Sequence, residues 1–71
     1  MSLRDRKKAR TRASLVEVAQ RMFAERGYPA TTLEAICKEV EITVPTLLRY
    51  FPTKAALSVA PAADALAPLI S

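Results

Sequence analysis

Residues 31–51 read TTLEAICKEVEITVPTLLRYF, and this stretch decides the fold. Thr31 stands three residues before Glu34, which is the spacing of a helix capping box, so we predict that Thr31 caps a helix of about nine residues. Thr32 is the alternative cap, one residue later. The apolar residues of this helix recur at the spacing of one helical face: Leu33, Ile36, Cys37 and Val40.

A second short helix is predicted over Val44–Tyr50, after a break at residues 41–43. Thr43 can cap it, and Pro45 falls in the first turn, where a proline is tolerated because its position needs no N–H donor. Pro52 follows the expected end of the helix. Two short helices joined by a three-residue turn form a helix-turn-helix unit, whose second helix enters the major groove of DNA.

The periodicity of this second helix allows two packings. In one, Leu47 and Phe51 point inward together with Ile42, and Val44 and Leu48 stay near the surface, where they could meet base edges and thymine methyl groups. In the other, a single buried stripe includes Val44 and Leu48 as well. Spacing alone favours the buried stripe at least as much as the exposed arrangement.

A long helix is predicted to precede this unit and another to follow it. The first spans about residues 4–26, and we expect Gly27 to end it in the left-handed conformation. Thr53 can cap a fourth helix that reaches about Ala60 and is interrupted by Pro61. The expected fold is therefore all-α: a small, homeodomain-like helical bundle with a helix-turn-helix, made of three helices plus the start of a fourth.

The charge of the chain is concentrated at its start. The net charge is +4, yet residues 4–12 alone hold six Lys and Arg side chains and one Asp. Such a basic segment suits a polyanion, either nucleic acid or a membrane surface on which the helix of residues 4–26 could lie. A solvated, frayed N-terminus is the plainer alternative.

The composition argues against an enzyme. There is no histidine, no glycine-rich phosphate loop and no cluster of metal ligands, so we expect no catalytic residues, no metal and no cofactor. Cys37, the single cysteine, falls on the apolar face of a predicted helix, where a packed thiol is expected. No apolar run approaches the ~20 residues that span a membrane.

From Arg12 to Leu57 the chain resembles the TetR family of transcriptional repressors. The stretches that carry this resemblance are AQRMFAERGY at residues 19–28, TTLEAI at 31–36, ITVPTL at 42–47 and YFPTKAAL at 50–57. The span from Arg12 to Leu57 covers nearly two-thirds of the chain. The resemblance implies sequence-specific binding to DNA by a regulator that is ligand-responsive and represses transcription.

The resemblance also implies a set of contact residues. Residues 44–46 would lie nearest the bases, with Arg49 in reach of base or phosphate, Tyr50 and Lys54 on phosphates, and the two threonines before the first short helix on the DNA backbone. The DNA-binding residues expected on this basis are Thr31, Thr32, Thr43, Val44, Pro45, Thr46, Leu48, Arg49, Tyr50 and Lys54.

Two positions depart from the family pattern. Glu41 stands where the turn usually has glycine, and a non-glycine residue with positive φ costs about 1 kcal/mol. Leu48 stands where the family commonly has tyrosine, so it keeps an apolar contact and loses a hydroxyl. These departures bear on affinity and on the operator sequence more than on the fold.

The predicted organisation has three parts: a basic arm at residues 1–12, the DNA-binding domain at 13–57, and at 58–71 the start of a connection to a C-terminal ligand-binding and dimerisation domain. The implied partners are double-stranded DNA with a palindromic operator, a second copy of the full-length parent, and a small-molecule inducer held by that C-terminal domain. The expected location is the bacterial cytoplasm, at the nucleoid and not at a membrane.

A helical protein–protein interaction module without DNA binding is the alternative from another functional class. It is suggested by apolar side chains near the end of the chain that could seek a partner. These residues are Leu57, Val59, Leu66, Leu69 and Ile70.

Overall fold

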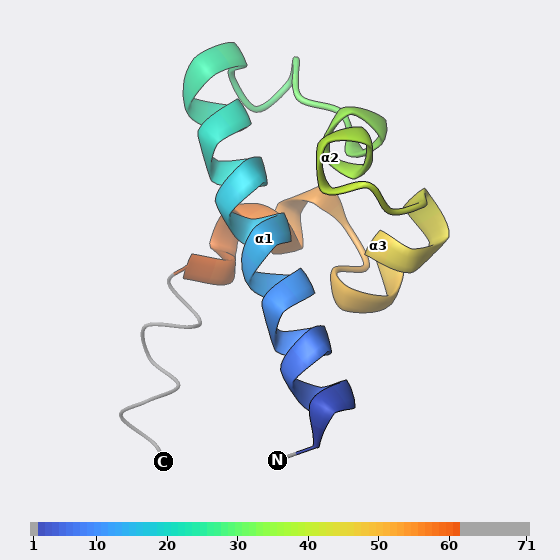
Figure 1. Ribbon diagram of the computed structural model, residues 1–71. Helices are drawn as coiled ribbons and strands as arrows, with labels where there is room; N and C mark the ends of the chain where they lie inside the picture. Colours follow the sequence, from blue (N-terminus) through green and yellow to red (C-terminus); the bar gives the residue numbers. More distant parts are fainter. Residues whose placement is uncertain (1, 62–71) are drawn as a thin grey trace.

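The computed structural model describes residues 2–61 and contains only helices within that range (Figure 1). They are α1 (Leu3–Arg26), α2 (Leu33–Val40) and α3 (Val44–Tyr50), followed by a helical segment over residues 54–61. This arrangement confirms the predicted all-α fold, with three helices and the start of a fourth. No helix among the described residues is long and apolar enough to cross a membrane.

The basic N-terminal segment is part of α1. Ser2 caps the helix, since its Oγ accepts a hydrogen bond from the Asp5 backbone N–H at 3.3 Å, and the Asp5 carboxylate lies in the first turn, where the helix dipole favours negative charge. The helix continues through residue 12 without a break. The frayed N-terminus is therefore wrong, and the basic side chains are held on a regular helix.

Gly27 ends α1 in a different way from the one expected. Its φ of 88° is positive as predicted, but its ψ of 155° places it outside the left-handed helical region, in a region that is open essentially to glycine alone. The Gly27 N–H donates to the Phe23 carbonyl at 2.9 Å, and the Gly27 carbonyl accepts from Thr31 Oγ1 at 2.9 Å. The glycine thus ties the connecting loop to the end of the helix.

The cap of α2 is Thr32 and not Thr31. Thr32 has extended backbone, and its Oγ1 accepts from the Ala35 N–H at 3.1 Å. The hydroxyl of Thr31 is already committed to the Gly27 carbonyl, and the whole residue is 0% exposed. The capping box predicted from Thr31 is therefore wrong, because a bond to the preceding loop has taken the hydroxyl.

The turn of the helix-turn-helix places a non-glycine residue at positive φ. Glu41 has φ 64° and ψ 44°, and the next N–H, that of Ile42, donates to the Cys37 carbonyl at 3.0 Å. This bond spans the end of α2 in the manner of a Schellman motif, which requires a left-handed residue between the partners. The positive φ expected at Glu41 is confirmed.

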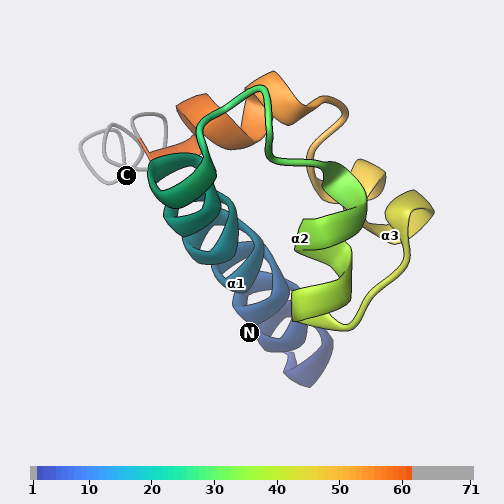
Figure 2. The same cartoon turned by 90° about the horizontal axis from the view of Figure 1, so that it is seen from above.

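The core lies where α1 faces α2 and α3, and the segment of residues 54–61 closes it beside the C-terminal half of α1 (Figure 2). The buried apolar residues are Leu15, Ala19, Met22, Ile36, Cys37, Leu47, Phe51, Leu57 and Ala60. The charged pair Arg21–Glu39 links α1 to α2 at the surface, where such a pair contributes little to stability.

Pro61, the last described residue, is itself helical, so the segment extends one residue past its expected end at about Ala60. A helical proline leaves the carbonyl four residues earlier without its donor, and here Gln20 Nε2 donates to that carbonyl, on Leu57, at 3.2 Å. The remainder of the predicted connection, residues 62–71 with Pro68, Leu66, Leu69 and Ile70, lies outside the described residues.

Candidate nucleic-acid interface

The outer face of α3 is formed by residues that are not buried in the core. Leu47 is 0% and Phe51 4% exposed, so these two residues anchor the helix, whereas Leu48 is 39% exposed. Pro45 and Arg49 are also exposed, and Val44 is half-buried. Of the two packings allowed by the periodicity, the single buried stripe is wrong, because Leu48 points away from the core.

The first turn of α3 orders two hydroxyl groups at the surface. Thr43 caps the helix, its Oγ1 lying 3.4 Å from the Thr46 backbone N, and the two hydroxyl oxygens are 2.9 Å apart. One hydroxyl donates to the other, so one hydroxyl proton of the pair is left over for an outside acceptor. The pair can therefore present a fixed donor next to the exposed ring of Pro45.

The threonines before α2 have separate roles. Thr32 is exposed and caps the helix, so its side chain and the free N–H groups of the first turn face solvent, as a contact to the DNA backbone requires. Thr31 is fully buried. Its predicted place in a DNA contact is corrected to a structural one, because neither its hydroxyl nor its backbone reaches the surface.

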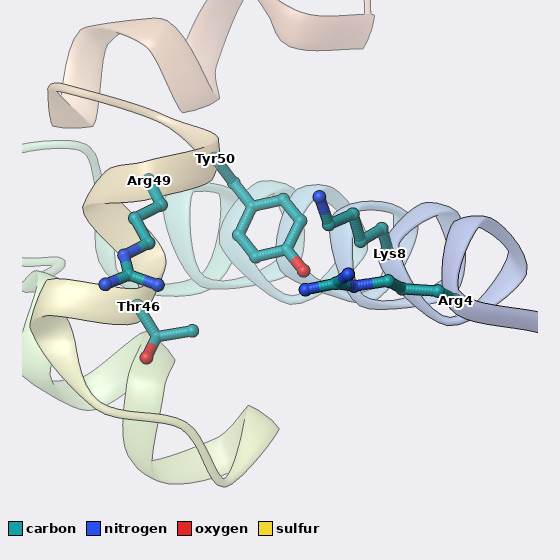
Figure 3. A pocket seen from close by; sticks show the side chains of 5 residues that line it. All are labelled: Arg4, Lys8, Thr46, Arg49 and Tyr50. Atoms are coloured by element: carbon teal, nitrogen blue, oxygen red, sulfur yellow. The ribbon is translucent and has the colours of Figure 1, made fainter.

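A cleft of about 380 Å³ lies between the start of α1 and α3, lined by Arg4, Lys8, Thr46, Arg49 and Tyr50. Figure 3 shows the Tyr50 hydroxyl directed toward the side chains of Arg4 and Lys8. The fold thus brings together three predicted contact residues of α3 and two cations that the sequence offered only as general charge. The sequence feature that could have identified Arg4 and Lys8 is their spacing of four residues, which puts them on one helix face.

Lys54 is held by the loop between α1 and α2. Its Nζ donates to the carbonyls of Tyr28 at 2.8 Å and Thr31 at 2.9 Å, and lies 4.4 Å from the centre of the Tyr28 ring. Sequence reasoning missed this role, because the partners are more than twenty residues away. An ammonium group has three N–H donors, so one remains for another acceptor.

Cys37 packs as the sequence predicts, buried in the core at 4% exposure. Burial, and secondarily the negative charge of Glu34, raises the pKa of the thiol above its ordinary value. The group is therefore a neutral packing element. Among residues 2–61 no group of His, Cys, Asp and Glu side chains is arranged to hold a metal ion.

Comparisons with known proteins agree with this geometry. The family model described as bacterial regulatory proteins, tetR family, matches residues 15–60. The chain is 39% identical over 59 residues to the HTH-type transcriptional regulator TcmR of Streptomyces glaucescens, and 40% identical over 43 residues to the HTH-type transcriptional regulator YuxN of Bacillus subtilis. These alignments cover 83% and 61% of this chain.

The chain spans only part of these relatives: 26% of the length of TcmR and 15% of that of YuxN. No solved structure gave a significant match. The family match covers most of the chain and contains α2, α3 and the turn between them. On this basis the chain belongs to the tetR family of bacterial regulatory proteins, as a helix-turn-helix DNA-binding domain.

Proposed function

We propose that this domain reads a DNA operator by placing the outer face of α3 in the major groove, as part of a ligand-responsive repressor. The observation that carries the proposal is the exposure of Leu48 and Pro45 beside Arg49 on a helix fixed from behind by Leu47. Leu48 and Pro45 give this face apolar contact area, and Arg49 adds hydrogen-bond donors and a positive charge. A major groove offers both thymine methyl groups and hydrogen-bond acceptors to such a face.

Each part of the surface has a proposed role. Residues 44–46 approach the base edges, with the Thr43–Thr46 hydroxyl pair as donor and Leu48 against a thymine methyl group. Arg49 reaches base or phosphate. The Tyr50 hydroxyl, the Thr32 end of α2 and the third N–H of Lys54 bind phosphates and so fix the orientation of the domain on the duplex.

The larger protein is proposed to act as a homodimer on a palindromic operator, with its inducer in a C-terminal domain. This part of the proposal rests on family membership, since the chain spans 26% of TcmR. Two copies of α3 would then meet half-sites about one helical turn, ~34 Å, apart. We further propose that the protein is not an enzyme and that it works at the nucleoid in the bacterial cytoplasm, because the ligand it binds is chromosomal DNA.

The domain by itself is proposed to bind DNA weakly and as a monomer, mostly through phosphate contacts. One such module presents a single recognition helix, and without a second copy the sequence-independent electrostatic contribution dominates. Affinity should then fall steeply with salt, by about 0.9 in log–log slope for each phosphate that is neutralised.

A selection from random duplex DNA tests the proposal with the full-length parent. We expect an enriched palindromic site, and we expect the Thr46→Ala variant to change base preference at a few positions while leaving the others as they are. Enrichment of no sequence, together with stable oligomers that ignore DNA, would show instead that the domain is a helical protein–protein interaction module.

A further inference from the structure

The N-terminal turns of α1 extend beyond the hydrophobic core. Residues 3–10 are all exposed, whereas the first buried residue of the helix is Leu15. Packing of the core therefore does not explain why this stretch lies where it does, or why it carries so many cations. Their arrangement around the helix axis shows where they can act.

One face of this extension is a row of cations directed toward α3. Arg4, Lys8 and Arg12 follow one another at intervals of four residues, which keeps them on one side of the helix. Arg12 lies over the Phe51 ring, with its guanidinium carbon 5.0 Å from the ring centre, at the C-terminal end of α3. The first two cations line the cleft already described, together with Thr46, Arg49 and Tyr50.

The composition of this cleft is that of an anion site. Its lining includes two guanidinium groups, one ammonium group and one phenol hydroxyl, and none of the five lining residues is acidic. Figure 3 shows the Tyr50 hydroxyl on one side and the Arg4 and Lys8 side chains on the other, directed toward one another. An anion between them would be bound by two helices at once.

We propose that this cleft binds a phosphodiester group of the DNA backbone, at the edge of the major groove that α3 enters. The inference rests on the proposed function and adds to it that α1 is a DNA-binding element with two residues of its own, Arg4 and Lys8. Because the extension is a helix, these side chains are held at a fixed position relative to α3. The bound phosphate therefore sets how deeply α3 enters the groove.

General attraction by a basic helix is the competing explanation, and the chain supplies a matched control. Arg6 and Lys7 belong to the same exposed turns and carry the same charges, but they line a separate hollow with Leu3 and Arg10, and no residue of α3 lines it. Long-range attraction depends on charge and should treat the two pairs alike. A phosphate clamp requires only the pair that faces α3.

The test compares the double variants Arg4→Gln/Lys8→Gln and Arg6→Gln/Lys7→Gln in the full chain. Binding to a fluorescein-labelled 30-base-pair duplex is followed by anisotropy over a series of KCl concentrations. For the first variant we expect about a tenfold loss of affinity near 0.1 M salt and a log–log slope that is shallower by about 0.9, the value for one phosphate. The control variant should lose less than about threefold.

A third substitution links the two helices. Tyr50→Phe should weaken binding by the unmodified chain but have little further effect once Arg4 and Lys8 are replaced, because groups that bind one phosphate are not additive. Equal losses and equal slopes for the two double variants would overturn the clamp. An unmodified chain with no salt-dependent binding to the duplex would instead overturn the proposed function itself.

Discussion

Gln20 Nε2 donates a hydrogen bond of 3.2 Å to the carbonyl oxygen of Leu57, four residues before Pro61 in the last described helical segment. Proline has no N–H, so a helix that includes Pro61 leaves an acceptor open four residues earlier. The amide of Gln20 also lies 3.4 Å from the Ser58 carbonyl. One side chain of α1 thus supplies a donor to the carbonyl that is left open when the helical segment includes Pro61.

This relationship predicts that the effects of Gln20 and Pro61 on stability are coupled. Gln20→Leu should lower the free energy of unfolding by about 1–2 kcal/mol, because the Leu57 carbonyl loses its donor. Pro61→Ala should then restore more stability in the Gln20→Leu variant than in the unmodified chain, since Ala provides the N–H itself. Urea denaturation of the four proteins measures this coupling. Equal gains from Pro61→Ala in both backgrounds would show that the two positions are independent.

Glu41 is expected to lower both stability and affinity for DNA, for separate reasons. Glu41→Gly should raise the free energy of unfolding by about 0.5–1 kcal/mol, because glycine adopts positive φ without strain. Glu41→Gln keeps the strain and removes the charge, so it should leave stability nearly unchanged and tighten DNA binding. Thermal denaturation and duplex titration separate the two effects. A stabilisation of equal size in both variants would assign the cost to charge instead of backbone.

Lys54 is expected to contribute to stability as well as to binding. Lys54→Met keeps the aliphatic stem but removes the ammonium donor from both carbonyls. The Tyr28 carbonyl keeps its bond from the Thr31 N–H, whereas the Thr31 carbonyl loses the lysine donor, so we expect a loss of about 1–2 kcal/mol in the free energy of unfolding. If the third N–H also binds a phosphate, the salt slope of DNA binding should become shallower by about 0.9. An unchanged slope, measured well below the melting temperature, would leave Lys54 with its structural role alone.

The thiol of Cys37 is expected to be unreactive in the folded protein. Burial raises its pKa, so at a given pH the thiolate, which is the nucleophile, is less populated than in an exposed cysteine. Alkylation by iodoacetamide at pH 8 should be much slower in buffer than in urea. A raised pKa in the folded state also means that the contribution of this thiol to stability is retained below its unfolded pKa and lost as pH rises through the folded value. Equally fast alkylation in buffer and in urea would contradict this packing.

Features that depend on a few neighbouring residues could be predicted closely. The start of α3 after its cap Thr43, with Pro45 in the first turn, and the end of α1 at Gly27 follow from local hydrogen bonds and allowed φ values. The positive φ of Glu41 was expected from the family pattern, in which glycine usually stands at this position. Even so, the cap of α2 was predicted at Thr31 and is Thr32 in the structure. The choice between adjacent threonines was made by a bond from Thr31 back to the preceding loop.

The candidate site could be predicted only as far as α3 itself. Thr46, Arg49 and Tyr50 were expected at the surface and line one cleft. Arg4 and Lys8 were not expected there, because spacing places them on a common face without saying which helix that face meets.

The chain of residues, taken by itself, determined that there would be two short capped helices around a tight turn, a basic helix before them and a helical segment after. These features follow from interactions within one or two turns of backbone. Only the tertiary structure decided that Leu48 is exposed while Leu47 is buried. It also decided that Lys54 binds the loop before α2, and that Arg4 and Lys8 of α1 line a cleft with residues of α3. Several faces of each helix satisfy its own hydrogen bonds equally well, and the choice among them is made by packing against residues far away in the sequence.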